Sequence, residues 1–232
     1  MPRKRSKNMF EELQGNQSCY DVTNVQKLAS SPLEGKRILY LGSSITVGYG
    51  SLNTSYADYI AKRNGTTFVK EAVSGTCLVD DQADSYVSRL HTVDVNDKFD
   101  MFVCQLSTND FSKFKPIGNV DDVEPTTVCG AINHIVDYVR KTWGCTVVFY
   151  TCHNFHEARY EEMIRDLLEI AQKKNFYVID LYNDKQFNDI TDEQRALYMA
   201  DNMHPTKAGY LLWWTPAFEC YLNEVATNGK VD

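Results

Sequence analysis

One serine and one aspartate–histidine pair are the side chains in this sequence whose types and spacing best suit catalysis. Ser44 lies in the stretch GSSITVG, and Asp201 and His204 lie three residues apart in ADNMHP. A hydroxyl is a poor nucleophile at neutral pH and needs a base, usually an imidazole held by a carboxylate. A turn of this length can place the Asp201 carboxylate against Nδ1 of His204, which leaves Nε2 to face Ser44. We therefore predict a Ser44–His204–Asp201 triad.

Three groups at turns could stabilise the negative oxygen of a tetrahedral acyl intermediate. They are the backbone N–H of Ser44, the backbone N–H of Gly75 in SGT, and the side-chain amide of Asn109 in STND. Glycine lets the backbone approach a substrate closely, and asparagine is a neutral donor. Because losing one such donor costs about 3 kcal/mol in the barrier, a working site should hold several. We predict that these three donors form an oxyanion hole.

The same Gly/Ser turn could instead cradle a phosphate. A Walker-type loop carries a lysine beside its closing Ser or Thr, and residues 42–51 contain no basic residue. The spacing of Gly42, Gly48 and Gly50 also differs from the G-x-G-x-x-G dinucleotide fingerprint. Backbone amides at a helix start can still hold an anion, so a non-catalytic module that binds an anionic ligand remains the alternative.

The turn TCHNFHE gathers Cys152, His153 and His156. A metal ion there would need another cluster to complete its four ligands, and the sequence offers none, so we predict no metal site. We expect His153 and Phe155 to line the pocket for the acyl or alcohol part of a substrate. Ser43, beside the candidate nucleophile, is assigned to substrate binding, with a role as helix cap as the alternative.

These side chains need a scaffold that brings their turns together, and the hydrophobic pattern predicts one. Short runs rich in β-branched and aromatic residues indicate strands buried on both faces, at 37–42, 66–73, 99–107, 145–152 and 176–182. Amphipathic segments predict helices at 56–63, 84–91, 126–143, 157–174 and 206 to about 225. This alternation predicts an α/β protein: a flavodoxin-like three-layer α/β/α sandwich with a five-stranded parallel sheet.

The carboxyl ends of parallel strands meet at one edge of the sheet, where ligands bind. The candidate motifs follow strands or precede the last helix, so this fold would gather them at that edge. The last helix also carries Trp213 and Trp214 side by side, and we expect only one of the two to face inward.

Composition narrows the classes of function. The 232 residues are 43% hydrophobic, which suits one domain with an ordinary core. The formal net charge of −7 argues against nucleic-acid binding, which needs a basic surface. We place a single domain at 35–232 and interpret 1–34 as a tail or wrapping segment. Its basic residues Arg3, Lys4, Arg5 and Lys7 are expected to be a solvated terminus.

No apolar run is long enough to span a bilayer, and the polar sequence after the N-terminal charges does not suit a secretory signal. The seven cysteines include no C-x-x-C pair, and Cys104, Cys145 and Cys152 fall in or beside predicted strands. This pattern favours reduced thiols that act as core residues. We therefore expect a cytoplasmic protein without a membrane partner, and the sequence leaves its oligomeric state open.

Taken together, the motifs resemble those of the SGNH hydrolases, the GDSL-type esterase/lipase family, which is named for Ser, Gly, Asn and His in four separate blocks. GSSITVG is similar to the first block and SGT to the second, which contain Ser44 and Gly75. STND resembles the third block with Asn109, and DNMHP the last with Asp201 and His204. The four blocks occur in the order that the family has.

Two positions depart from the family pattern. Ser43 stands where an aspartate is usual, which makes the first block a G-S-S variant, and Ser107 stands where the third block usually begins with glycine. The resemblance implies hydrolysis of a small-molecule ester without a metal or organic cofactor. Carbohydrate O-acetyl or short-chain acyl esters are the expected substrates, and a lysophospholipase- or thioesterase-type acyl hydrolase is an alternative within the same chemistry.

Overall fold

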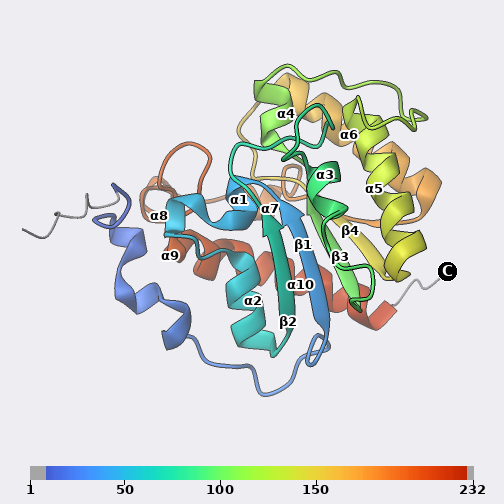
Figure 1. Ribbon diagram of the computed structural model, residues 1–232. Helices are drawn as coiled ribbons and strands as arrows, with labels where there is room; N and C mark the ends of the chain where they lie inside the picture. Colours follow the sequence, from blue (N-terminus) through green and yellow to red (C-terminus); the bar gives the residue numbers. More distant parts are fainter. Residues whose placement is uncertain (1–8, 229–232) are drawn as a thin grey trace, which may run out of the picture.

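A five-stranded parallel sheet forms the centre of the protein. The computed structural model describes residues 9–228 and is shown in Figure 1. The strands lie in the order β2-β1-β3-β4-β5, and every neighbouring pair is parallel. Their bounds are β1 Arg37–Gly42, β2 Thr67–Ala72, β3 Met101–Gln105, β4 Thr146–Tyr150 and β5 Tyr177–Ile179. The predicted flavodoxin-like three-layer sandwich is confirmed.

Burial explains why these runs are nearly continuous in hydrophobicity. The central strands β1, β3 and β4 are almost wholly buried, whereas the edge strands β2 and β5 are mostly half-buried. Several observed strands are shorter than predicted. The apolar residues that follow them are buried although they lie outside the strand, so hydrophobicity alone predicted strands that were too long. Gly42 pairs with Ala72, and Leu41 pairs with Cys104, so β1, β2 and β3 end at a common edge.

Helices cover both faces of the sheet (Figure 1). On one side α2 contacts α10, and on the other α5 contacts α3 and α6. The helices are α1 Ser44–Val47, α2 Tyr56–Asn64, α3 Tyr86–Leu90, α4 Thr108–Ser112, α5 Val128–Trp143, α6 Ala158–Lys174, α7 Lys185–Asn188, α8 Asp192–Tyr198, α9 Lys207–Gly209 and α10 Thr215–Asn228. Short 3-10 turns are η1 Gln14–Asn16, η2 Ser18–Tyr20, η3 Val22–Asn24 and η4 Tyr49–Ser51.

The last helix is continuous from α9 to α10 through one π-helical turn, η5 Tyr210–Trp214, in which the N–H of Thr215 donates to the carbonyl of Tyr210. The expectation that only one of the two tryptophans faces inward is wrong, because Trp213 is 7% exposed and Trp214 is 0% exposed. Trp213 stacks on Phe187 of α7, with ring centroids 4.6 Å apart. The short helix α7, which the sequence did not predict, therefore covers the outward side of the pair.

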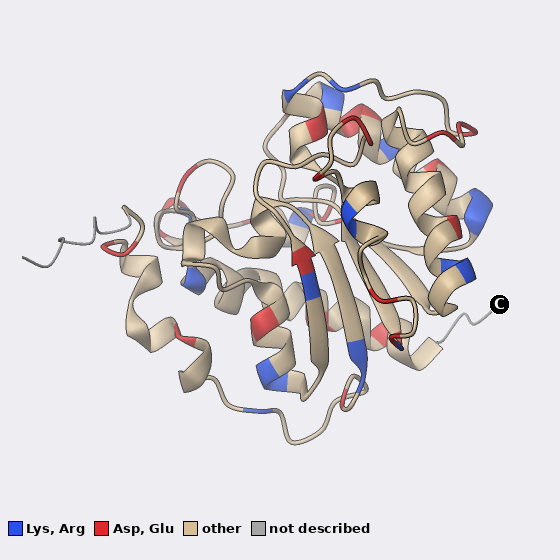
Figure 2. Ribbon diagram, viewed as in Figure 1, with Lys and Arg blue, Asp and Glu red and all other residues tan. Residues whose placement is uncertain are grey.

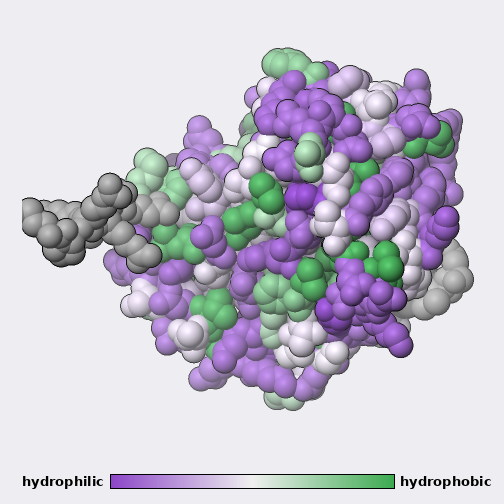
Figure 3. All heavy atoms as spheres, in the orientation of Figure 1, coloured by the Kyte–Doolittle hydropathy of each residue, from purple (hydrophilic) through white to green (hydrophobic). Residues whose placement is uncertain are grey.

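On the face in view, charged residues are mixed rather than gathered by sign. Figure 2 shows acidic and basic positions interspersed along the helices and loops of the face in view. The same face is mainly hydrophilic, with small separate hydrophobic patches (Figure 3). No helix within residues 9–228 is long and apolar enough to cross a membrane. The basic residues Arg3, Lys4, Arg5 and Lys7 lie outside the described residues.

Candidate active site

The turn after β1 places Ser44 at the start of α1. Ser44 is 7% exposed, so the residue is almost wholly packed in the turn. Below it the Oε1 of Gln105, at the end of β3, accepts the N–H of Ser43 at 3.0 Å and the hydroxyl of Thr46 at 2.9 Å. A fully buried side chain on the neighbouring strand therefore fixes the turn from beneath.

The loop between α8 and α9 holds Asp201 and His204 against each other. Nδ1 of His204 lies 2.8 Å from Oδ2 of Asp201 and 3.0 Å from Oδ1. Oδ1 also accepts the backbone N–H of Met203 at 2.8 Å and that of His204 at 2.7 Å. Nε2 of His204 lies 2.8 Å from Oγ of Ser44, across 160 positions of sequence. The three residues of the predicted triad are thus in hydrogen-bonding contact.

The carboxylate of Asp201 is strongly acidic in this setting. Partial burial, the largest single influence, raises its pKa, but the hydrogen bonds from the His204 side chain and from the N–H groups of Met203 and His204 together outweigh burial and lower the pKa to about 2. Asp201 is therefore ionised at neutral pH. An ionised acceptor at Nδ1 requires that nitrogen to carry the proton, which leaves the Nε2 lone pair free to accept the Ser44 proton.

The predicted oxyanion donors lie at the same edge of the sheet. Ser44 is the first residue of α1, so its N–H has no partner within the helix. Gly75 adopts a φ of +83°, which favours glycine, and a Cβ there would meet no heavy atom within 4 Å. Nδ2 of Asn109 donates one hydrogen to the carbonyl of Thr76 at 3.0 Å. That bond orients the amide and leaves its second hydrogen available.

The loop that carries Gly75 is fastened to the start of α4. The buried carboxylate of Asp110 accepts the N–H groups of Leu78 and Val79, at 2.7 and 3.1 Å. Nζ of Lys113 donates to the carbonyl of Gly75 at 2.6 Å. Burial raises the pKa of Asp110, although hydrogen bonds from Ser107, Leu78 and Val79 oppose the change. Asp110, directly after Asn109, and Lys113, four residues after it, therefore set the position of the second block relative to the third.

A buried arginine links two of the strand ends and the Gly75 loop from below. Nη2 of Arg89, on α3, donates to the carbonyl of Gly42 at 2.9 Å and to the hydroxyl of Thr76 at 3.1 Å. Nη1 donates to the carbonyl of Glu71 at 2.8 Å. One planar guanidinium thus binds backbone carbonyls at the ends of β1 and β2 and the side-chain hydroxyl of Thr76 in the Gly75 loop.

A cavity of about 610 Å³ opens beside the Asp201–His204 loop and is lined by residues 153–156 and by Asp201 and Asn202, among others. His153 and Phe155, which we expected at a substrate pocket, both belong to its wall. His153 is 2% exposed, and its Nε2 lies 3.3 Å from the carbonyl oxygen of Asn202. Burial lowers the pKa of His153 to about 4, against the opposing effect of its bond to Asn202. The imidazole is therefore neutral and can donate to that carbonyl.

Ser43 occupies a different setting from the one that a substrate contact requires. Its side chain is fully buried, and its hydroxyl lies 3.4 Å from Oε1 of Gln105. Ser43 precedes α1 without a side-chain capping bond. Its contacts support the turn that presents Ser44.

Within residues 9–228 no group of three or more His, Cys, Asp or Glu side chains could hold a metal ion.

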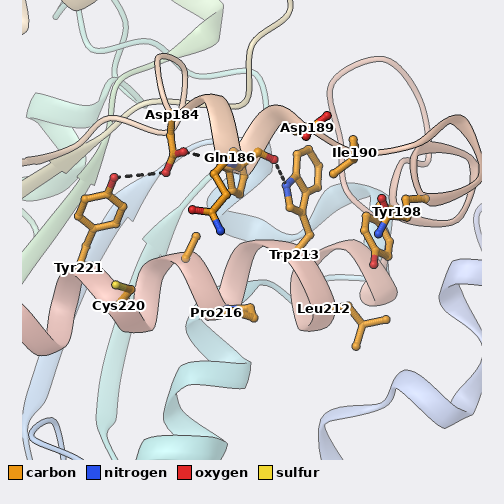
Figure 4. Close-up of a pocket in the computed structure, with 13 residues that line it drawn as sticks. Asp184, Gln186, Asp189, Ile190, Tyr198, Leu212, Trp213, Pro216, Cys220 and Tyr221 are labelled. Carbon is orange, nitrogen blue, oxygen red and sulfur yellow. Dashed lines mark hydrogen bonds between the residues drawn. The ribbon is translucent and has the colours of Figure 1, made fainter.

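A second cavity, of about 460 Å³, lies between α7, α8 and the last helix (Figure 4). Trp213 forms part of its wall, and its Nε1 donates to the carbonyl of Phe187 at 2.7 Å. The ring centroid of Trp213 lies 5.7 Å from that of His153. Trp213 therefore lines this cavity and also meets the ring of His153, which contacts the Asp201–His204 loop.

Sequence reasoning missed the groups that support the site. Asp110 directly follows Asn109 in STND, so the sequence could predict that it lies near the site. Its hydrogen bonds to Leu78 and Val79 could not be predicted in this way. Gln105 is a polar residue in an otherwise apolar strand, which is a usable signal for a buried polar contact. Arg89 carries no comparable signal, because an arginine on a short amphipathic helix is normally exposed.

Residues 40–212 match the model of the GDSL-like lipase/acylhydrolase family. Among solved structures, a protein from Lactobacillus plantarum is 19% identical, with a TM-score of 0.72 over 82% of this chain and 98% of that one. A family two carbohydrate esterase from Clostridium thermocellum, in complex with cellohexaose, is 19% identical, with a TM-score of 0.58 over 87% of this chain and 67% of that one. These likenesses establish the fold. No curated protein sequence matches the chain significantly.

Proposed function

The chain belongs to the GDSL-like lipase/acylhydrolase family and is a serine hydrolase of esters, and on that premise we propose that it cleaves small carboxylic esters through an acyl-enzyme formed on Ser44. Acetyl and other short-chain acyl esters, above all O-acetyl groups on carbohydrates, are the proposed substrates. Ser44 is the proposed nucleophile, His204 the base and Asp201 the group that orients the base.

The observation that carries this proposal is the contact between Ser44 and His204. The 2.8 Å between Oγ and Nε2 is a hydrogen-bonding distance at which an imidazole can remove the hydroxyl proton as the oxygen attacks. Asp201, with its pKa lowered to about 2, supports the tautomer that the transfer needs. It would also stabilise the imidazolium that forms.

In the first half-reaction, Oγ of Ser44 attacks the acyl carbonyl carbon while its proton passes to Nε2 of His204. The carbonyl oxygen becomes an oxyanion, and the N–H groups of Ser44 and Gly75 and the amide of Asn109 are the donors proposed to stabilise it. The intermediate then collapses. The bond to the alcohol oxygen breaks, that oxygen takes the proton from His204, and the alcohol leaves.

In the second half-reaction, water attacks the acyl carbon as His204 removes one of its protons. A second tetrahedral intermediate forms and uses the same donors. When it collapses, the bond to Oγ of Ser44 breaks, and His204 returns the proton to that oxygen. The carboxylic acid leaves and the enzyme is restored, with water as the only co-reactant.

Two observations support the choice of a small ester. The wall of the 610 Å³ cavity contains the polar side chains of Asn154 and Asn202 as well as the apolar Phe155 and Met199, which suits a mixed polar and apolar molecule. A protein of the same fold is a carbohydrate esterase in complex with an oligosaccharide. Both are consistent with an acyl group carried on a sugar.

A fluorophosphonate probe tests the proposed nucleophile. Wild type should be labelled at one site, and Ser44→Ala should lose both labelling and ester hydrolysis. Ser43→Ala is the matched control, because the neighbouring hydroxyl faces Gln105 and not His204, and it should remain labelled. Labelling of Ser44→Ala at the wild-type rate would refute the assignment.

A substrate panel tests the proposed acyl group. p-Nitrophenyl esters of rising chain length should be cleaved fastest at two to four carbons, and acetylated sugars should release acetate. Hydrolysis of long-chain esters alone would contradict the proposed substrate class while leaving the nucleophile assignment intact.

A further inference from the structure

The segment before the sheet contacts both halves of the candidate active site. We call residues 10–24 the N-terminal segment; it precedes the region matched by the family model, which begins at residue 40. The segment runs along the side of the molecule that carries α2, α8 and α9 (Figure 1). Its turn η1 contacts α8 and α9, and η3 contacts α2. It therefore touches the elements on either side of His204.

Asn16 joins the two loops through backbone hydrogen bonds. Its side chain is almost fully buried, and Nδ2 donates to the carbonyl of Gly50 at 2.8 Å and to that of Phe10 at 2.9 Å. Oδ1 accepts the N–H of Lys207 at 2.9 Å. Gly50 lies six residues after Ser44, and Lys207 lies three residues after His204. A single side-chain amide thus connects the segment that follows Ser44 to the segment that follows His204.

The contacts around Asn16 leave little room for movement. A Cβ at Gly15 would lie 2.1 Å from the carbonyl oxygen of Leu197 and 2.3 Å from Oγ1 of Thr206, so the backbone packs directly on α8 and on the loop that carries His204. Nζ of Lys207 lies 2.5 Å from Oδ1 of Asp21. The N-terminal segment is therefore held against α9 on both sides of Asn16.

A row of aromatic rings leads from the same segment to the imidazole. Phe10 meets Tyr49 edge to face, with ring centroids 5.3 Å apart. Tyr49 in turn meets His204, with centroids 5.0 Å apart. Tyr49 is 46% exposed and Phe10 is buried, so Phe10 backs the ring that contacts His204. The side of the imidazole is thereby fixed by a ring that the N-terminal segment supports.

We propose that the N-terminal segment positions the active site, with Asn16 holding the two loops in register and Tyr49 holding the plane of His204. This inference rests on the proposed roles of Ser44 and His204. Neither Asn16 nor Tyr49 touches the reacting atoms; each is a positioning residue. Proton transfer between Oγ and Nε2 depends steeply on their separation, and a shift of about 1 Å can reduce the rate on the order of a hundredfold.

The test of Asn16 compares Asn16→Ala with Asn24→Ala in the full chain. Asn24 is the matched control, since its Nδ2 donates to the carbonyl of Ser18 within the same segment. Asn16→Ala should lower kcat and the rate of fluorophosphonate labelling by roughly tenfold or more while KM stays within about twofold, because the substrate site itself is untouched. Asn24→Ala should match wild type.

The loss must be separated from simple unfolding. The labelling rate is therefore measured well below the melting temperature, and the final labelled fraction reports how much protein is folded. Full final labelling at a reduced rate is the expected result for Asn16→Ala. A wild-type labelling rate, or an equal loss of rate in Asn24→Ala, would overturn the proposal.

Tyr49 gives a second test with a conservative rescue. Tyr49→Phe keeps the ring against His204 and should retain the wild-type kcat, whereas Tyr49→Ala removes it and should lower kcat severalfold. Equal activity in the two variants would contradict the role of the ring. If wild type itself is unlabelled, or if Ser44→Ala stays active, the proposed function fails instead, so the two failures are distinguishable.

Discussion

The carboxylate of Asp201 does more than face the imidazole. It accepts the N–H groups of Met203 and His204 as well as Nδ1 of His204, so the same group shapes the turn and orients the ring. The spacing of three residues predicts the contact with the ring, because a tight turn brings the two side chains together. The two backbone bonds explain how an acid that is 42% exposed in its side chain can hold one geometry.

His153 gives a pH-dependent prediction at the same scale. Burial lowers its pKa to about 4, whereas a histidine in the unfolded chain titrates near 6.5. The unfolded state therefore binds more protons between these values, so stability is fully present above about pH 6.5 and falls as the pH drops towards 4. The loss is expected to reach up to roughly 3 kcal/mol.

Urea unfolding at pH 7 and pH 4 measures this loss. His153→Gln should lose less stability than wild type over that interval, whatever its stability at pH 7. His156→Gln is the control, because His156 is an exposed histidine in the same loop and should behave like wild type. An identical pH dependence in His153→Gln and wild type would show that His153 is not the group responsible.

The site residues that could be predicted are those that stand in a short sequence motif. In each such motif the neighbouring residues indicate the chemistry, as they do for Ser44, Gly75, Asn109 and the Asp201–His204 pair. Asn16 does not, because the groups that it joins lie 34 and 191 positions away. Nothing in a single sequence indicates which distant carbonyl an asparagine will meet.

Among the elements, α3 matters because of the one side chain that it inserts below the strand ends. Arg89 donates to the carbonyls of Gly42 and Glu71 and to the hydroxyl of Thr76, and its side chain is only 8% exposed. Arg89→Met should therefore remove a charged donor from all three acceptors and lower the free energy of unfolding by roughly 3 kcal/mol.

Chemical denaturation of Arg89→Met measures that loss, and Arg165→Met, at an exposed position on α6, serves as the control with an expected change within about 0.5 kcal/mol. Ester hydrolysis should also fall in Arg89→Met, since Gly42 and Thr76 flank the proposed nucleophile and oxyanion donors. A stable and fully active Arg89→Met would mean that the strand ends are held by other contacts.

Element prediction succeeded where hydrophobic period decided the structure and failed where packing did. The core strands and the long helices follow from runs and amphipathic stripes. The short helices α7 and α8 have too few residues for a period, and their capping residues Asp184 and Thr191 were the available signals. The π-helical turn depends on how Trp213 and Trp214 pack against α7, which only the three-dimensional arrangement defines.

At the scale of the whole molecule, the exposure of the cysteines indicates how well the core excludes solvent. All seven are free, and only Cys19 and Cys220 are exposed. The predicted burial of Cys104, Cys145 and Cys152 is confirmed. Burial raises the pKa of the Cys152 thiol to about 12, which suppresses the reactive thiolate.

A disulfide reagent added to the native protein should therefore modify two thiols rapidly, and all seven in guanidinium chloride. Replacing Cys19 and Cys220 by serine should abolish the rapid phase. A third thiol that reacts as fast as the first two in the native state would show that part of the core opens readily.

The whole fold could be predicted because its strands alternate with helices in a pattern that few topologies satisfy. The position of the segment before β1 could not, because it lacks a hydrophobic period and is held by individual polar contacts such as that of Asp21 with Lys207.

The distance along the chain between Ser44 and His204 also bears on how the protein comes into being on the ribosome. A nascent chain that has emerged through β5 already contains every strand of the sheet, yet it lacks His204 and also Lys207, whose N–H donates to Asn16. On the proposed mechanism such a chain is silent towards esters. The onset of hydrolysis during translation would therefore mark the moment at which the segment that carries His204 and α10 docks on the sheet.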